Sequence, residues 1–240
     1  MKIHGTAKGG AESKKDFGVA FSSGGGGVGC TYETDFSTNT GWTTQGANFT
    51  IDTTNNELDF KGERNGNNDA IGYDLTEVSD TEWNLRFKFI IDDINDADGA
   101  GIITCFGLRS KNQTNEADTA QDAIGYFTFN SNSAAESDFR SAFADNTYVY
   151  ANAAEIGSNI LAENTFYIEI KRTAADEAIV TVTTNSDFSG GSSNTIDVSG
   201  IANLRYIVFS NQKNASSSDN YIEGRIQDLK FVNDTSTACS

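Results

Sequence analysis

The chain has 240 residues, enough to bury a substantial core, and 34 acidic against 17 basic residues give it a formal net charge of −17. An acidic surface repels phosphates, so we expect neither nucleic acids nor anionic membranes as partners. The sequence has no proline and 23 glycines, and Asn, Asp, Ser and Thr are abundant, which argues against a helical protein. No window approaches the roughly 20 apolar residues of a membrane-spanning helix, so we expect no membrane insertion.

The first part of the chain differs from the rest. Residues 1–29 carry four lysines and end in the linker Gly24–Gly27, whereas residues 30–240 have the composition of one folded domain. Residues 1–29 are either a disordered tail or an arm that docks the domain on other structural subunits. They lack the apolar stretch of a Sec signal peptide. An extracellular or virion location then requires a trimmed sequence, another export route or release by lysis.

The most regular pattern of the domain runs from Glu82 to Ser110. Apolar residues occupy alternate positions from Trp83 to Ile91, as in a strand with one buried face. An acidic connection from Asp92 to Gly101 follows, and then the apolar run Ile102–Leu108. We predict that these two segments pair as the central hairpin of a β-sandwich.

Turn residues divide the remaining chain into short runs with the same alternation. The predicted strands are Thr31–Ser37, Asn48–Thr53, Glu57–Gly62, Ala70–Leu75, Glu82–Ile91, Gly101–Ser110, Ile124–Asn130, Phe139–Ala144, Thr147–Ala151, Phe166–Arg172, Ala178–Thr184, Thr195–Val198, Arg205–Ser210 and Tyr221–Val232. Residues 152–164 lack a sustained period and are predicted to be a loop. Many short strands with polar punctuation predict an all-β fold, a two-sheet antiparallel sandwich or jelly roll. The last strand changes phase near Gln227, which predicts a bulge that bends it between the two sheets.

Three cysteines are present, an odd number. Cys105 lies in an apolar run and is predicted to be buried as a free thiol. Cys30 and Cys239 flank the first and last predicted strands, which are often neighbours in such sandwiches. They form either a disulfide or two free thiols, and nothing has the spacing of a zinc site.

Several segments together resemble the concanavalin A-like lectin/glucanase superfamily, in its laminin-G-like, pentraxin-like branch. They are TDFSTNTGW (34–42), ELDFKG (57–62), EWNLRFKFII (82–91), the hairpin FYIEIKR…AIVTVTT, YIVFSN and the closing GRIQDLKF (224–231). The resemblance covers residues 31–234 and implies a jelly roll whose end matches a Gly-x-Ile-x-Asp pattern at Gly224, Ile226 and Asp228. The leader, residues 2–21, is similar to leaders of jelly-roll proteins from marine viruses and archaea.

Catalytic groups are the weakest part of this resemblance. The glucanases of the superfamily carry Glu-x-Asp-x-x-Glu on one strand, and the nearest match here has Glu57 and Asp59 but Gly62 in place of the second Glu. We expect Glu57, Asp59 and Glu169 to be solvated residues of strand faces. A Ser-His-Asp or Cys-His site needs a histidine in the domain, and the only one is His4. No catalytic residue is therefore predicted, and we expect that the protein is not an enzyme.

Carboxylates suggest one cofactor, Ca²⁺, although they also suit a solubilising surface. Asp92, Asp93, Asn95, Asp96 and Asp98 crowd one segment, which is either an Asx-rich turn or half of a Ca²⁺ site. The resemblance implies a second candidate, because related jelly rolls hold a structural Ca²⁺ between the first and last strands. There it would join Asp228 to Glu33 or Asp35.

Sugar binding needs exposed aromatic rings beside polar side chains. The candidates are Tyr73, Tyr126, Tyr148 and Tyr150, which we assign to polar loops. Trp83 is assigned to the core, and Trp42 is predicted to cap the first strand.

Three hypotheses for function follow. The first is a non-catalytic, lectin-like module, displayed on a surface for adhesion or receptor binding, whose partner is a glycan or polysaccharide. The second is a structural subunit of a virion or appendage that uses the jelly roll for assembly. The third and weakest is a glycoside hydrolase or lyase. Fold alone does not choose among them.

Overall fold

The computed structural model describes residues 29–63, 69–95, 101–112, 122–130, 137–144, 165–211 and 220–239. These residues form strands and no helix, so none of the described segments is a helix able to cross a membrane. The strands are β1 (Tyr32–Thr34), β2 (Trp42–Gln45), β3 (Phe49–Asp52), β4 (Glu57–Glu63), β5 (Ala70–Asp74), β6 (Trp83–Asn95), β7 (Gly101–Arg109), β8 (Ala123–Asn130), β9 (Ser137–Ala144), β10 (Thr165–Ala174), β11 (Glu177–Thr183), β12 (Ser192–Asp197), β13 (Tyr206–Asn211) and β14 (Tyr221–Asn233).

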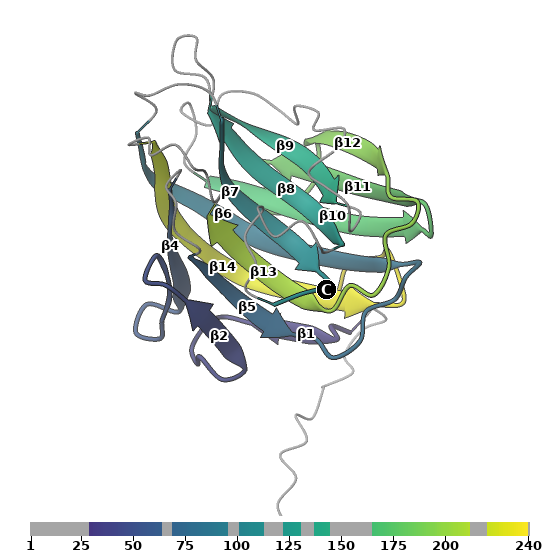
Figure 1. Ribbon diagram of the computed structural model, residues 1–240, viewed down its shortest axis with the longest axis horizontal. Helices are drawn as coiled ribbons and strands as arrows, with labels where there is room; N and C mark the ends of the chain where they lie inside the picture. The colour runs from purple at the N-terminus through teal and green to yellow at the C-terminus, as the bar shows by residue number, and fades with distance from the viewer. Residues whose placement is uncertain are drawn as a thin grey trace, which may run out of the picture.

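The strands form two antiparallel sheets that lie one in front of the other in Figure 1. The eight-stranded sheet has the order β12-β11-β10-β6-β14-β4-β3, with β1 paired to β14 beyond that path. The six-stranded sheet has the order β2-β5-β13-β7-β8-β9. The predicted all-β, two-sheet sandwich is therefore confirmed, and so is the pairing of the first strand with the last.

The predicted central hairpin is wrong. β6 pairs with β10 and β14 in the eight-stranded sheet, whereas β7 pairs with β13 and β8 in the six-stranded sheet. β6 also continues to Asn95, through residues that we had assigned to a connection. A period-2 pattern tells which face of a strand is buried but not which strand lies beside it. The pattern was therefore unable to show that β6 and β7 belong to different sheets and face each other across the core.

The core lies between the sheets and is rich in phenylalanine. Phe89 stacks on Phe60 with ring centroids 4.9 Å apart, and both rings contact Phe106 of the opposite sheet. Phe209 joins them from β13, and Trp83 is fully buried, as predicted. Offset and edge-on ring pairs of this kind add to the stabilisation from burial alone, so they fix how the two sheets pack.

The last strand contains the predicted bulge. Gln227 lies opposite Lys88 and Lys230 opposite Arg86, so β14 has one residue more than β6 between these pairs. Asp228 takes up the extra residue with a left-handed backbone, φ 52°. The bulge restores the phase, so the apolar residues on both sides of it reach the same core: Ile222, Ile226, Leu229 and Phe231. The predicted bend between the sheets is wrong, because the strands paired with β14 all belong to the eight-stranded sheet.

One described strand, β2, is absent from the predicted list. Trp42 begins this strand instead of capping the first, and its indole Nε1 donates a hydrogen bond to the Tyr32 hydroxyl (3.1 Å). The Tyr32 ring stacks on Tyr73 at 3.9 Å, and Trp42 packs against Tyr73 at 5.4 Å. The three rings close one edge of the sandwich where β1 of one sheet meets β2 and β5 of the other.

Three predictions about the fold lie outside the described residues. They are the strand Thr147–Ala151, the loop 152–164 and the N-terminal arm, of which only Gly29 is described.

Candidate functional site

A groove of about 860 Å³ lies on the outer face of the eight-stranded sheet. Its floor is formed by outward-facing residues of β6, β10 and β14, because the alternate residues of these strands point into the core. Its walls are β1 with the residues that follow it, and the loop between β11 and β12.

One wall of the groove is aromatic. Phe188 lies in the loop after β11 with a left-handed backbone, φ 61°, and its ring meets Tyr167 of β10 edge-on, with centroids 5.6 Å apart. The guanidinium of Arg86 lies over the Phe188 ring, 4.5 Å from its centroid. Both rings are half-buried and line the groove, so a ligand there meets an apolar surface beside charged groups.

Arg86 is held in place by a buried carboxylate. Oε1 of Glu169 accepts hydrogen bonds from Arg86 Nε (2.8 Å) and Asn84 Nδ2 (2.8 Å), and it forms an ion pair with Arg86 Nη2 (2.7 Å). Nη1 of Arg86 makes no hydrogen bond within the described part of the chain. Glu169 is 7 % exposed, so the prediction that it is a solvated residue is wrong. Asn84 also donates a hydrogen bond to Ser236 O (3.0 Å), so the segment after β14 passes beside this buried cluster.

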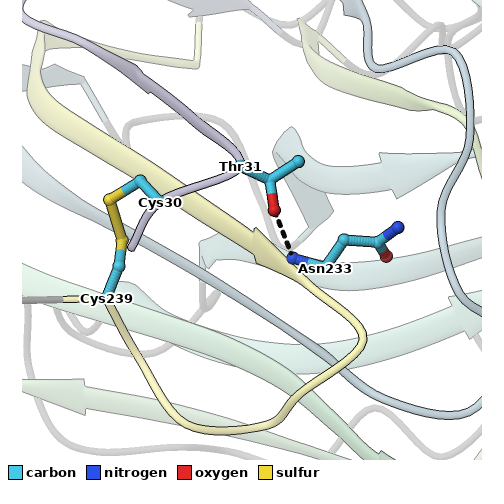
Figure 2. The surroundings of a disulfide bond; sticks show 4 residues. All are labelled: Cys30, Thr31, Asn233 and Cys239. Carbon is cyan, nitrogen blue, oxygen red and sulfur yellow. Dashed lines mark hydrogen bonds between the residues drawn. A yellow bond between two sulfur atoms is a disulfide. The ribbon is translucent and has the colours of Figure 1, made fainter. Parts of the chain in front are cut away.

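A disulfide fastens that segment. Cys30 and Cys239 are bonded, with Cα atoms 5.1 Å apart and 209 positions apart in the chain. Figure 2 shows the bond beside the hydrogen bond from Asn233 N to Thr31 Oγ1 (2.9 Å), which ties the end of β14 to the start of β1. Of the two alternatives for these cysteines, the structure has the bridge, and Cys105 is buried as a free thiol. Cys239 itself lines the groove, so the disulfide is part of its wall.

The carboxylates around the groove differ in whether their oxygens already accept hydrogen bonds. Hydrogen bonds from the hydroxyl and backbone N–H of Ser37 hold the pKa of Asp35 below its usual value, and Ser189 does the same for Asp187. These two carboxylates therefore shape the turns that form the walls. Asp228 at the bulge is exposed, and no hydrogen bond or ion pair occupies its side chain within the described residues.

The predicted Ca²⁺ ligands have other partners. Arg225 donates to both carboxylate oxygens of Asp92 (2.9 and 2.7 Å), and the hydroxyl of Tyr221 donates to Asp93 (2.7 Å). Both acids belong to β6 rather than to a loop, as does Asn95. Asp96 and Asp98 lie outside the described residues.

The second candidate metal site is the one between the first and last strands. Glu33, Asp35 and Asp228 all line the groove. Within the described ranges, however, no group of three or more His, Cys, Asp or Glu is arranged to hold a metal ion. Calcium therefore stays a prediction.

The predicted sugar-binding tyrosines lie elsewhere. Tyr73 belongs to β5, not to a polar loop, and its ring packs in the aromatic cluster at the edge of the sandwich. Tyr126 belongs to β8, where its backbone pairs with Phe106, and its side chain is outside the described part. Tyr148 and Tyr150 also lie outside it. None of the four lines the groove in the part of the chain that is described.

Glu57 and Asp59, which approach the glucanase pattern, lie on the same outer face but away from the groove. Glu57 is 7 % exposed rather than solvated, and its Oε2 accepts a hydrogen bond from Gln227 Nε2 (2.9 Å). Burial, with Glu57 close by, raises the pKa of the partly buried Asp59. Gln227 in turn accepts a hydrogen bond from Lys88 (3.1 Å), so polar contacts link this region to the groove.

Comparison with known proteins supports the architecture. No family model and no curated protein matches the chain. Among solved structures, the CBM2 module of the evolved Dit protein of Lactobacillus casei BL23 phage J-1 matches with a TM-score of 0.55 at 15% identity, over 85% of this chain and 94% of that one. The Bauhinia forficata lectin in complex with GalNAc matches with a TM-score of 0.55 at 13% identity, over 85% and 98%. The chain has the concanavalin A-like fold.

Enzymes also share the concanavalin A-like fold with this chain. A carbohydrate esterase from the Shiga toxin-encoding bacteriophage phi24B matches with a TM-score of 0.54 at 10% identity, over 86% of this chain and 100% of that one. At such identities the matches establish the fold, and they leave the origin suggested by the leader unsupported.

Sequence reasoning placed Glu33, Asp35 and Asp228 in a candidate site but missed the basic and aromatic residues that line the groove. Alternation had placed Arg86, Lys88 and Tyr167 on outward positions, without indicating that they face a hollow. Phe188 had the clearest signal, an aromatic residue alone in the polar stretch Asn185–Gly191. A single apolar residue in a polar stretch is common on protein surfaces, so only the neighbouring Tyr167 and Arg86 in the folded structure make it part of a candidate site.

Proposed function

We propose that the domain is a lectin-like, non-catalytic carbohydrate-binding module and that the groove on the eight-stranded sheet binds the sugar. The observation that carries the proposal is the pair of rings, Tyr167 and Phe188, in one groove with Lys230 and Asp228, whose side chains make no hydrogen bond within the described residues. Sugars present apolar C–H faces and rings of hydroxyls, which suit aromatic walls flanked by charged donors and acceptors.

The structural relatives support this choice of class. Two of the three reported above are a carbohydrate-binding module and a lectin, and the third is an esterase that acts on carbohydrate. Because two of them come from phages and the disulfide suits an oxidising environment, we place the module on an extracellular surface or a virion, where it attaches its carrier to glycans.

The non-catalytic part of the proposal rests on the groove's chemistry. Asp35 and Asp187, two of its carboxylates, have depressed pKa values, which suits them as hydrogen-bond acceptors but not as general acids. Release of reducing ends or acetate from a polysaccharide panel would instead establish an enzyme.

A glycan array probed with the whole chain tests the proposal. Tyr167→Ala and Phe188→Ala should each weaken binding at least about tenfold, and Tyr206→Ala, which removes a half-buried tyrosine from the other sheet, should leave it unchanged. Binding that survives both groove variants would overturn the assignment of the site. No binding by the parent protein would favour a structural subunit of a larger assembly.

The same array, run with Ca²⁺ and again with EDTA, tests the predicted cofactor. Loss of binding in EDTA would establish a Ca²⁺-dependent lectin. Binding that survives EDTA would keep the lectin and remove calcium from its mechanism.

A further inference from the structure

The floor of the groove carries three cations on two neighbouring strands. Lys230 of β14 lies directly opposite Arg86 of β6, and Lys88 is two residues from Arg86 on the same face. Like charges directly opposite each other in a sheet are destabilising. The protein has 34 acidic residues that could pair with these three cations. A cluster that is only partly paired therefore suggests that the cations have a ligand.

Two of these cations have no carboxylate partner in the part of the chain that the structure describes. The Lys88 ammonium donates to the amide oxygen of Gln227 (3.1 Å), and Lys230 makes no ion pair or side-chain hydrogen bond within the described residues. Glu33 faces Lys230 across β1 and β14, yet the two form no ion pair. Arg86 is neutralised by Glu169, but its Nη1 makes no hydrogen bond to any of the described residues.

The exposure of the charged side chains determines whether a ligand in the groove interacts more strongly with the basic or with the acidic groups. Arg86, Lys88 and Lys230 are half-buried, whereas the acids of the walls are exposed. Water screens exposed carboxylates efficiently, and charges at the base of a groove interact more strongly with a bound group. Asp35 and Asp187 also use carboxylate oxygens in their own turns. The floor is therefore suited to an anion, although the domain as a whole is acidic.

On the basis of the proposed function, we infer that the groove binds an acidic glycan, one whose sugar rings carry a carboxylate or a sulfate ester. The anionic group lies between Lys88 and Lys230 on the floor, and a sugar ring packs on Tyr167. Ring hydroxyls donate hydrogen bonds to the exposed carboxylate of Asp228 at the rim. The two lysines thus determine which glycans the module selects.

Calorimetric titration of the full chain tests this inference with three probes, polygalacturonate, carrageenan and neutral laminarin. We expect binding of a charged probe that weakens as salt is raised, because added ions screen the lysines. Polygalacturonate alone would identify the carboxylate as the ligand group, and carrageenan alone the sulfate ester. Lys88→Gln and Lys230→Gln should each reduce that affinity about tenfold, as expected for loss of a charge-assisted hydrogen bond.

Lys61→Gln is the matched control, since Lys61 lies on the same face outside the groove and should not change affinity. Unchanged affinity in both groove lysine variants would overturn the inference. Binding of laminarin but of neither charged probe would overturn it too, while leaving the proposed function intact. Failure of all three probes, with no signal on the glycan array, would remove both.

Discussion

Arg86 and Glu169 lie directly opposite each other on β6 and β10, and the guanidinium contacts one carboxylate oxygen, Oε1, through a hydrogen bond from Nε and an ion pair from Nη2. Glu169 is buried and shares Asn84 as a hydrogen-bond donor with the segment that the disulfide fastens, and the Arg86 guanidinium lies over the aromatic ring of Phe188. Stability and site geometry are thus joined in one pair of residues.

Glu169→Gln should destabilise the protein by about 1–3 kcal/mol, because it removes the acceptor charge of a buried cluster and leaves Arg86 and Asn84 poorly satisfied. Urea unfolding followed by tryptophan fluorescence measures this change. Glu77→Gln, at an exposed position, serves as the control and should shift the midpoint very little. A shift of equal size in both variants would contradict the role given to Glu169.

Reduction of the disulfide should destabilise the fold by about 4–5 kcal/mol, because the bond closes a very long loop of the unfolded chain. The urea midpoint of the parent protein should therefore fall when a phosphine reductant is added. The double variant Cys30→Ser/Cys239→Ser should show the lower midpoint at once and no further response to reductant. A midpoint that does not depend on reductant would show that the hydrogen bond between Asn233 and Thr31 suffices to hold the ends together.

The bulge residue Asp228 should favour glycine over alanine. With φ at 52°, a Cβ costs about 1 kcal/mol in the left-handed region, so Asp228→Gly should be about 1 kcal/mol more stable than Asp228→Ala. Asp228→Asn should stay close to the parent, since Asn tolerates this conformation. Thermal unfolding of the three variants orders them. Equal stability of the Gly and Ala variants would mean that the strand repacks without the bulge.

The surface pair Asp74 and Arg205 should contribute to the dependence of the unfolding free energy on pH in the acidic range. Hydrogen bonds from Arg205 hold the pKa of Asp74 below its usual value of 3.8. A depressed folded-state pKa stabilises the protein above the unfolded value, and this contribution is lost as pH falls through the folded-state pKa. Arg205→Gln should raise the pKa of Asp74 toward 3.8 in a carboxyl NMR titration. The parent and variant stabilities should also converge at low pH, and an unchanged pKa would show that the pair does not persist in solution.

Some of the architecture follows from the sequence alone. Alternation fixed the buried face of β6 and of the hairpin β10–β11, because side chains of a strand point to opposite faces wherever the strand ends up. The phase change in β14 likewise located its bulge within one or two residues of Gln227. These features depend on residues adjacent in the chain.

The tertiary structure decided what depends on distant residues. Local alternation carries no information about strand partners. The pattern therefore did not show that β6 and β7 lie in different sheets. Glu169 is buried beside Asn84, which also donates to Ser236 O of the segment after β14, whereas the sequence pattern around Glu169 is that of a solvated strand face. The groove exists because β1, β6, β10 and β14 meet with the loop after β11, and only folding brings these segments together.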